Sequence, residues 1–231
     1  MKHSHLALVL VLVGFTFGSR ASGQATDPAA VATSDAEQQK RADAWVESLR
    51  LDDPAKAARL RELILTHLKA VRDWHNAHAY TSVPEGLNPA TGKRLSTLDR
   101  QFIADSAISK SVQDDLMAGL RHDLSPEQVE AILDKYTEGK VAFTMGGYKA
   151  IVPDLTPEEE ATIRGFLKEA REQAIDFKGS KLISAVFEIY KTRSEQYLNS
   201  RGRDWKALYK SYTDAVRARK AAATTQTRSS S

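Results

Sequence analysis

Aromatic side chains that lie beside hydrogen-bonding cations are the residues of this sequence best suited to binding chemistry. Tyr190 is followed directly by Lys191 and, three positions on, by Arg193. Flat rings suit the faces of sugars, cations suit their hydroxyls, and glycines such as Gly146–Gly147 let a ligand approach the backbone. A Tyr or Trp at helical spacing is also a common core residue, so a packing role stays open for each. The candidate ligand-binding residues are Trp74, His75, Tyr136, Tyr148, Tyr190, Lys191 and Arg193.

The histidines offer a second chemistry, metal binding. His75 and His78 lie one helical turn apart, and Asp73 or Asn76 lies near enough in sequence to complete a shared site. Two helical histidines without a third nearby ligand are weak evidence. The alternative is that His67 and His78 are interior residues of an amphipathic helix with hydrogen-bonded rings, and that His75 is a partly exposed neighbour. We therefore expect no metal site.

Signatures of catalysis are missing from the sequence. It contains no glycine-rich phosphate loop, no G-x-S-x-G elbow, no H-E-x-x-H pair and no cysteine. Acidic residues are plentiful, but runs such as Asp114–Asp115 and Glu158–Glu160 fall on polar helix faces or in first turns, where they favour the helix dipole, and nothing singles out two acids as an acid–base pair. We expect no catalytic residue and no cofactor, and a glycan-active enzyme with a carboxylate pair remains an alternative.

The elements that must position these side chains are helices. Asp53 followed by Pro54 predicts a sharp helix start, with an apolar stripe through Leu60, Ile64, His67, Val71, Trp74 and His78. Ser125 and Thr156 each precede a proline and a capping-box partner three residues on, Gln128 and Glu159. The pattern predicts an all-α, single-domain bundle of about six to seven helices.

One short segment departs from the helical period. Val141, Phe143 and Met145 alternate with other residues next to Gly139, Gly146 and Gly147, which predicts an irregular or extended insert near 139–147.

The two ends of the chain differ from its middle. A basic start, the apolar run "LALVLVLVGFTFG" and small residues predict a signal peptide over 1–23, because the run is too short to span a bilayer comfortably. We expect a disordered leader over 24–36, one helical domain over 37–214 and a disordered basic tail over 215–231. The protein is then exported, periplasmic or extracellular, without stable membrane insertion after cleavage.

The charge balance argues against nucleic acid as a partner. Of the 33 basic residues, two lie in the signal peptide and four in the tail, which leaves 27 against 30 acidic residues in the body, or about −3. A body of that sign offers no broad face for phosphates.

Several stretches resemble a known family. "KVAFTM" with "GYKAIVPDL", and the later "AREQAID", "IYKTR" and "GRDW", are similar to the domain of unknown function 3826 family of secreted bacterial proteins, over about Ala36 to Tyr212. The resemblance implies a non-enzymatic helical domain that binds carbohydrate and is associated with polysaccharide utilisation, with a glycan as partner. A periplasmic helical chaperone or stress sensor, which shares helix starts such as "LSPEQ" and "LTPEE", remains the alternative.

These observations favour one functional face. The segment Tyr136–Pro153 holds rings beside glycines, and we expect it to act with the helix that carries Tyr190 and Arg193. The rival interpretation is that Val141, Phe143 and Met145 plug the end of a helical bundle.

The N-terminal pattern leads to the first prediction. We expect the exported chain to begin within a few residues of Gln24, because cleavage follows the small residues after the apolar run. Intact-mass measurement of secreted protein tests this, and secreted material that still carries Met1 would contradict it.

Overall fold

The protein is all-α throughout the part that the computed structural model describes, residues 28–89 and 91–229. Nine α-helices occur there and no strand does, apart from an isolated bridge between Leu87 and Arg94. The all-α prediction is confirmed, and the predicted number of helices was slightly low. In chain order the helices are α1 (Pro28–Glu47), α2 (Pro54–Ala77), α3 (Thr97–Asp105), α4 (Lys110–Asp123), α5 (Pro126–Tyr136), α6 (Lys140–Ile151), α7 (Pro157–Ala174), α8 (Ser180–Ser200) and α9 (Trp205–Ser229), with a 3₁₀ turn, η1 (Tyr80–Ser82), after α2.

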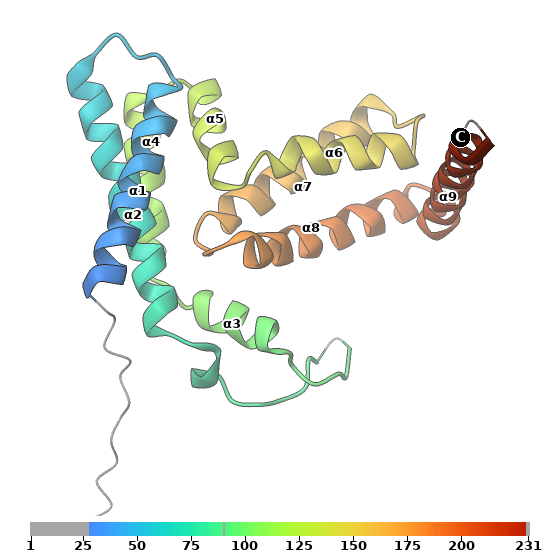
Figure 1. The fold of residues 1–231 in the computed structure, drawn as a ribbon, viewed down its shortest axis with the longest axis horizontal. Helices are drawn as coiled ribbons and strands as arrows, with labels where there is room; N and C mark the ends of the chain where they lie inside the picture. Colours follow the sequence, from blue (N-terminus) through green and yellow to red (C-terminus); the bar gives the residue numbers. More distant parts are fainter. Residues whose placement is uncertain (1–27, 90, 230–231) are drawn as a thin grey trace, which may run out of the picture.

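Helices α1, α2, α4 and α5 form one bundle, at the left of Figure 1. The predicted apolar stripe of α2 faces its core, since Leu60, Ile64, His67 and Val71 are all buried. The two last members of the stripe, Trp74 and His78, are half-buried at the end of the helix. The hydrophobic periodicity therefore predicted correctly which face of α2 is buried, over three helical turns.

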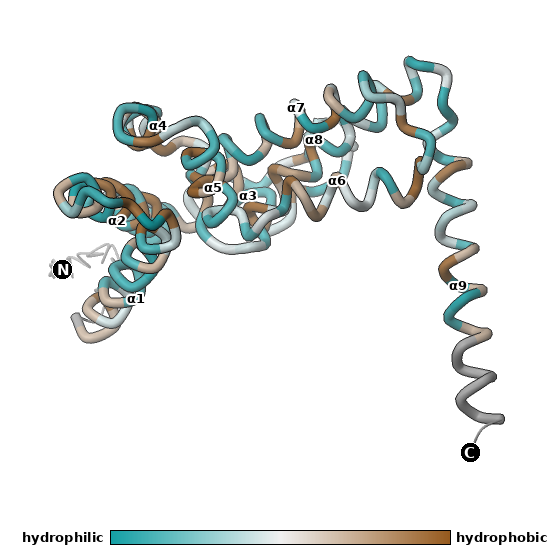
Figure 2. The backbone as a smooth tube through the Cα atoms, turned by 90° about the horizontal axis from the view of Figure 1, so that it is seen from above, coloured by the Kyte–Doolittle hydropathy of each residue, from teal (hydrophilic) through white to brown (hydrophobic). Residues whose placement is uncertain are grey.

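Helices α6, α7 and α8 form a second layer that extends away from the bundle, with its own core around Ile163, Leu167 and Leu198. Helix α9 follows a turn at Gly202, whose φ of 86° is a left-handed conformation that favours glycine. Figure 2 shows α9 leaving the far end of the layer at a steep angle. Among the described helices, none is long and apolar enough to cross a membrane.

The segment near 139–147 corrects the sequence prediction, because it is the first part of helix α6 and is not extended. Val141, Met145 and Tyr148 are buried on one face, at helical spacings of four and three. Phe143, the middle residue of the supposed alternation, has 83% of its surface exposed. Val141 and Met145 are four residues apart, a spacing that fits both a strand with every second residue apolar and a helix. Packing of the segment against α7 favours the helix.

Within the segments predicted as a disordered leader and a disordered tail, helix α1 begins at Pro28 and α9 continues to Ser229. Both segments are rich in alanine, the residue with the highest helix propensity. Asp35 of α1 also pairs with Arg72 and Lys69 of α2, which ties the supposed leader to the bundle. The predicted signal peptide lies outside the described residues.

The two capping boxes are present as predicted. Ser125 Oγ accepts from the Gln128 amide at 3.3 Å, and Thr156 Oγ1 accepts from the Glu159 amide at 3.2 Å. Glu159 is also hydrogen-bonded by Arg203, which lowers the pKa of its carboxyl to about 2. Glu159 therefore links the start of α7 to the turn between α8 and α9.

We expect Ser125→Ala and Thr156→Ala each to lower the free energy of unfolding by about 0.5–2 kcal/mol, because each leaves helix N–H groups without an acceptor. Urea unfolding measures this. Thr192→Ala is the matched control, since the Thr192 hydroxyl bonds only to Glu188 O in the middle of an exposed helix face. Equal losses in all three variants would show that the caps carry no special stability.

Candidate functional site

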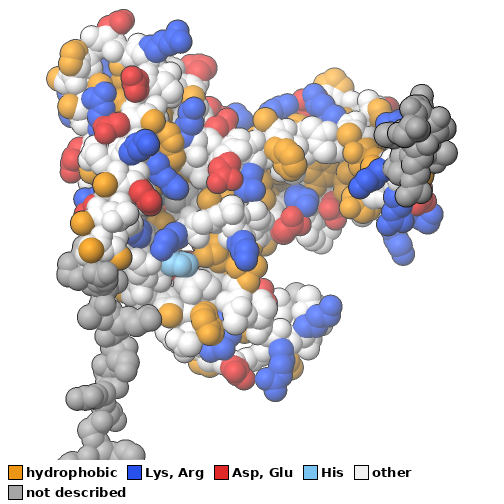
Figure 3. All heavy atoms as spheres, viewed as in Figure 1, with side chains coloured by type: hydrophobic (Ala, Val, Ile, Leu, Met, Phe, Trp, Pro, Cys, Tyr) orange, Lys and Arg blue, Asp and Glu red, His pale blue; other side chains and the backbone are white. Residues whose placement is uncertain are grey.

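A groove of about 850 Å³ lies between α6, α8 and α9, and each helix contributes residues three or four positions apart. Helices α6 and α8 run in the same direction along its two sides, and α9 closes one end. Figure 3 shows hydrophobic side chains gathered between α6 and α8, towards α9. The lining residues are Lys140, Phe143, Thr144, Gly146, Gly147, Tyr148, Ala150 and Ile151 of α6, Ser184, Phe187, Glu188, Lys191 and Glu195 of α8, and Trp205, Tyr209 and Tyr212 of α9.

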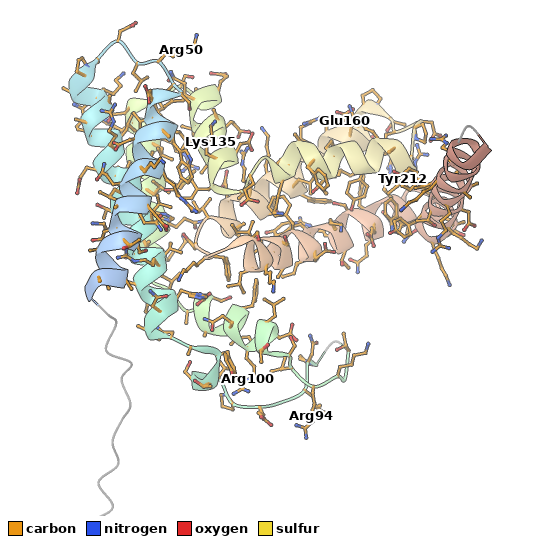
Figure 4. The ribbon with its side chains drawn as sticks, in the orientation of Figure 1. Arg50, Arg94, Arg100, Lys135, Glu160 and Tyr212 are labelled. Atoms are coloured by element: carbon orange, nitrogen blue, oxygen red, sulfur yellow. The ribbon has the colours of Figure 1, made fainter. Side chains whose placement is uncertain are left out.

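The closed end of the groove is aromatic. The Trp205 ring lies 5.2 Å from the Tyr148 ring and 6.1 Å from the Tyr209 ring, centroid to centroid. Tyr209 is 50% exposed, and Figure 4 places Tyr212 on the side of α9 that faces α6 and α8. Together with the exposed Phe143, these rings offer several accessible flat surfaces within one groove.

Polar groups lie among the rings. Lys191 Nζ donates to both carboxylate oxygens of Glu188, at 2.8 and 3.0 Å, and the Tyr148 hydroxyl donates to the Lys191 carbonyl at 3.1 Å. Burial raises the pKa of the half-buried Glu195 carboxyl, and burial together with the nearby Glu195 charge raises the pKa of Tyr148. Glu195 is thus a carboxylate in partly desolvated, aromatic surroundings.

Two adjacent glycines open the α6 wall. A Cβ atom added to Gly146 or Gly147 would meet nothing within 4 Å, so neither glycine is required by packing inside this chain. Glycine in a helix interior is unfavourable by about 0.5–1 kcal/mol relative to alanine. The pair leaves the helix backbone accessible from the groove.

Two of the seven predicted residues, Tyr148 and Lys191, line this groove. Tyr190 is buried in the core of the second layer and has 8% of its surface exposed. The Arg193 guanidinium lies over the Phe166 ring at 4.1 Å and pairs with Glu169 at 2.6 Å. Tyr190 and Arg193 therefore pack against α7 and are not in the groove.

The other three predicted residues belong to the bundle. Tyr136 is buried between the Trp45 and His67 rings, with centroids 4.7 and 5.2 Å away. Trp74 stacks on His78 at 3.7 Å and donates from Nε1 to the Ala104 carbonyl.

His75, next to Trp74, has a partner of its own, because its Nδ1 lies 2.7 Å from the buried Asp105 carboxylate. This pair joins α2 to α3. Over residues 28–89 and 91–229, no three His, Asp or Glu side chains are grouped so that they would hold a metal ion.

Several groove residues were not among the candidates, above all Trp205, Tyr209 and Glu195. Trp205, Tyr209 and Tyr212 follow a helical spacing of four and three, which indicated one face of the closing helix. What that face contacts depends on the direction of α9 after Gly202, and no local pattern encodes it.

The fold and the groove define a class of protein: an all-helical domain with an aromatic-lined groove between three helices. The chain belongs to the family described as "Protein of unknown function (DUF3826)", whose model matches residues 35–218. The match includes the groove-lining residues of α6, α8 and α9, and it confirms the family resemblance. No curated protein gives a significant match.

The burial of Tyr148 distinguishes its role from that of Arg193. With 3% of its surface exposed, Tyr148 supports the groove from below, so Tyr148→Ala should lower the free energy of unfolding by about 3–5 kcal/mol. Arg193→Ala removes an exposed ion pair and should lower it by about 1 kcal/mol or less. Thermal and urea unfolding of both variants check this. A Tyr148→Ala protein as stable as the wild type would contradict the packing described here.

Proposed function

We propose that this protein is an exported, non-enzymatic carbohydrate-binding protein and that the groove between α6, α8 and α9 holds the glycan. The observation that carries the proposal is the convergence of exposed rings and polar side chains in one groove of about 850 Å³. Binding pockets for small ligands measure roughly 300–1,000 Å³. Phe143, Trp205 and Tyr209 supply faces for stacking, and Glu188, Lys191 and Glu195 supply hydrogen bonds to hydroxyls.

The arrangement of carboxylates supports binding over hydrolysis. Glu188 and Glu195 are seven residues apart on one helix, so they lie about 10 Å apart along the same wall of the groove. Glycosidases place two carboxylates on either side of the scissile bond, roughly 5–9.5 Å apart. Glu188 is in addition engaged by Lys191.

The surface also supports a local ligand site over a broad client-binding cradle. Lys, Arg, Asp and Glu side chains are interspersed on the face that Figure 3 shows, and they form no extended basic surface there. Export is supported by the signal-like pattern at residues 1–23.

The glycines provide a test that separates binding from stability. In Gly147→Ala the new methyl group enters the groove, while the helix gains about 0.5–1 kcal/mol in propensity. We expect an unchanged or higher melting temperature and about tenfold weaker glycan binding. The ligand is first identified on a glycan array and the affinity is then measured by calorimetry.

Gly165→Ala is the matched control, because Gly165 is an exposed glycine inside α7, does not line the groove and has equally open space around it. This variant should show the same gain in stability and wild-type binding. Failure of the wild-type protein to bind any glycan would refute the function. Equal binding by both variants and the wild type would place the ligand elsewhere.

A further inference from the structure

The Glu195 carboxylate is the one acidic group in the groove lining that no cation contacts directly within the described residues. It takes part in no hydrogen bond and no ion pair there, although it is half-buried. Glu188, the other lining carboxylate, is bound through both oxygens by Lys191. A partly desolvated carboxylate without a partner is unfavourable, and a bound cation would relieve this.

The cations near Glu195 do not fill this role. Lys191 lies one turn before Glu195, and its ammonium binds Glu188. Burial raises the pKa of the Glu195 carboxyl, and the more distant Lys191 charge only partly opposes that shift. Lys140 begins α6 and so lies at the opposite end of the groove from Glu195. Helix α9 contributes only Trp205, Tyr209 and Tyr212 to the lining, and none of these is a cation.

Aromatic rings complete the surroundings of Glu195. The Glu195 charge acts on the Tyr148 hydroxyl, and the Tyr148 ring lies 5.2 Å from that of Trp205. An ammonium group at this end of the groove would donate a charge-assisted hydrogen bond to the carboxylate and gain cation–π attraction from the rings. A hydroxyl would gain only the hydrogen bond, and a sugar carboxylate would be repelled.

We infer that the groove selects glycans that carry a free, protonated amino group, that is, amino-sugar units without an N-acetyl group, and that Glu195 accepts the hydrogen bond from the ammonium. This inference rests on the proposed function and specifies its ligand. The specificity resides at the α9 end of the groove, while the open wall at Gly146–Gly147 accommodates the neighbouring sugar units.

Three matched tetrasaccharides test the inference at pH 6 by calorimetry: β-1,4-linked glucosamine, its fully N-acetylated form and the corresponding glucose tetramer. The amine tetramer should bind at least tenfold more tightly than the other two. In Glu195→Gln this preference should fall to within about twofold, because the amide carries no charge to pair with the ammonium.

Two controls separate recognition from unfolding and from general attraction. Burial raises the pKa of Glu195, so the charged form opposes folding, and any stability that the protonated carboxyl adds is lost as pH rises through its folded pKa. Glu195→Gln should therefore be at least as stable as the wild type at neutral pH. Asp115→Asn removes the same charge from an exposed position on α4 outside the groove and should leave the preference intact.

The outcomes are distinct. Equal binding of the three tetrasaccharides, or a wild-type preference in Glu195→Gln, overturns the inference and leaves the proposed function standing. An equal loss of preference in Asp115→Asn also overturns it, because general attraction to the acidic body would then explain the result. If the amine tetramer does not bind, the inference fails, and the glycan array decides the proposed function separately.

Discussion

The buried guanidinium of Arg171 is the interaction on which the arrangement of this protein depends. Only 1% of Arg171 is exposed, and its charge is balanced by Glu130 at 2.8 Å and Asp134 at 2.7 Å, both on α5. A buried charge without a partner is strongly destabilising, so α7 has one favourable position against the bundle. His67 and Asp176, 3.0 Å apart, join α2 to the segment that follows α7. These contacts orient the second layer, and the groove belongs to that layer.

A second arginine determines the shape of the groove. Arg203 binds Glu159 at 2.7 Å and Asp154 at 3.0 Å, which holds the turn between α8 and α9 against the start of α7. With that turn held, Trp205 at the start of α9 meets Tyr148 of α6. The aromatic end of the groove therefore depends on the two ion pairs of Arg203 and on a left-handed glycine, Gly202. A helix that left the turn in another direction would present the same rings to solvent.

The groove combines features that folding alone does not require. Phe143 and Tyr209 are large and exposed, Gly146 and Gly147 lower the helix propensity of α6 without relieving a contact, and Glu195 is half-buried without a partner. Each is unfavourable or neutral for stability, and all lie within one groove. Such local departures from consistent folding rules are expected at functional sites.

The sequence by itself determined the features that depend on neighbours along the chain. The caps at Ser125 and Thr156 and the buried stripe of α2 follow from local hydrogen bonding and from the helical period. Local pattern alone could not predict the structure of Lys140–Ile151, because the spacing of Val141 and Met145 fits both an alternating strand and a helix. Only the packed layer decided between the two, and it left Phe143 in solvent. The groove needed tertiary structure entirely, because Tyr148, Glu195 and Trp205 lie on three different helices, and the long-range ion pairs of Arg203 hold the turn before α9 in place.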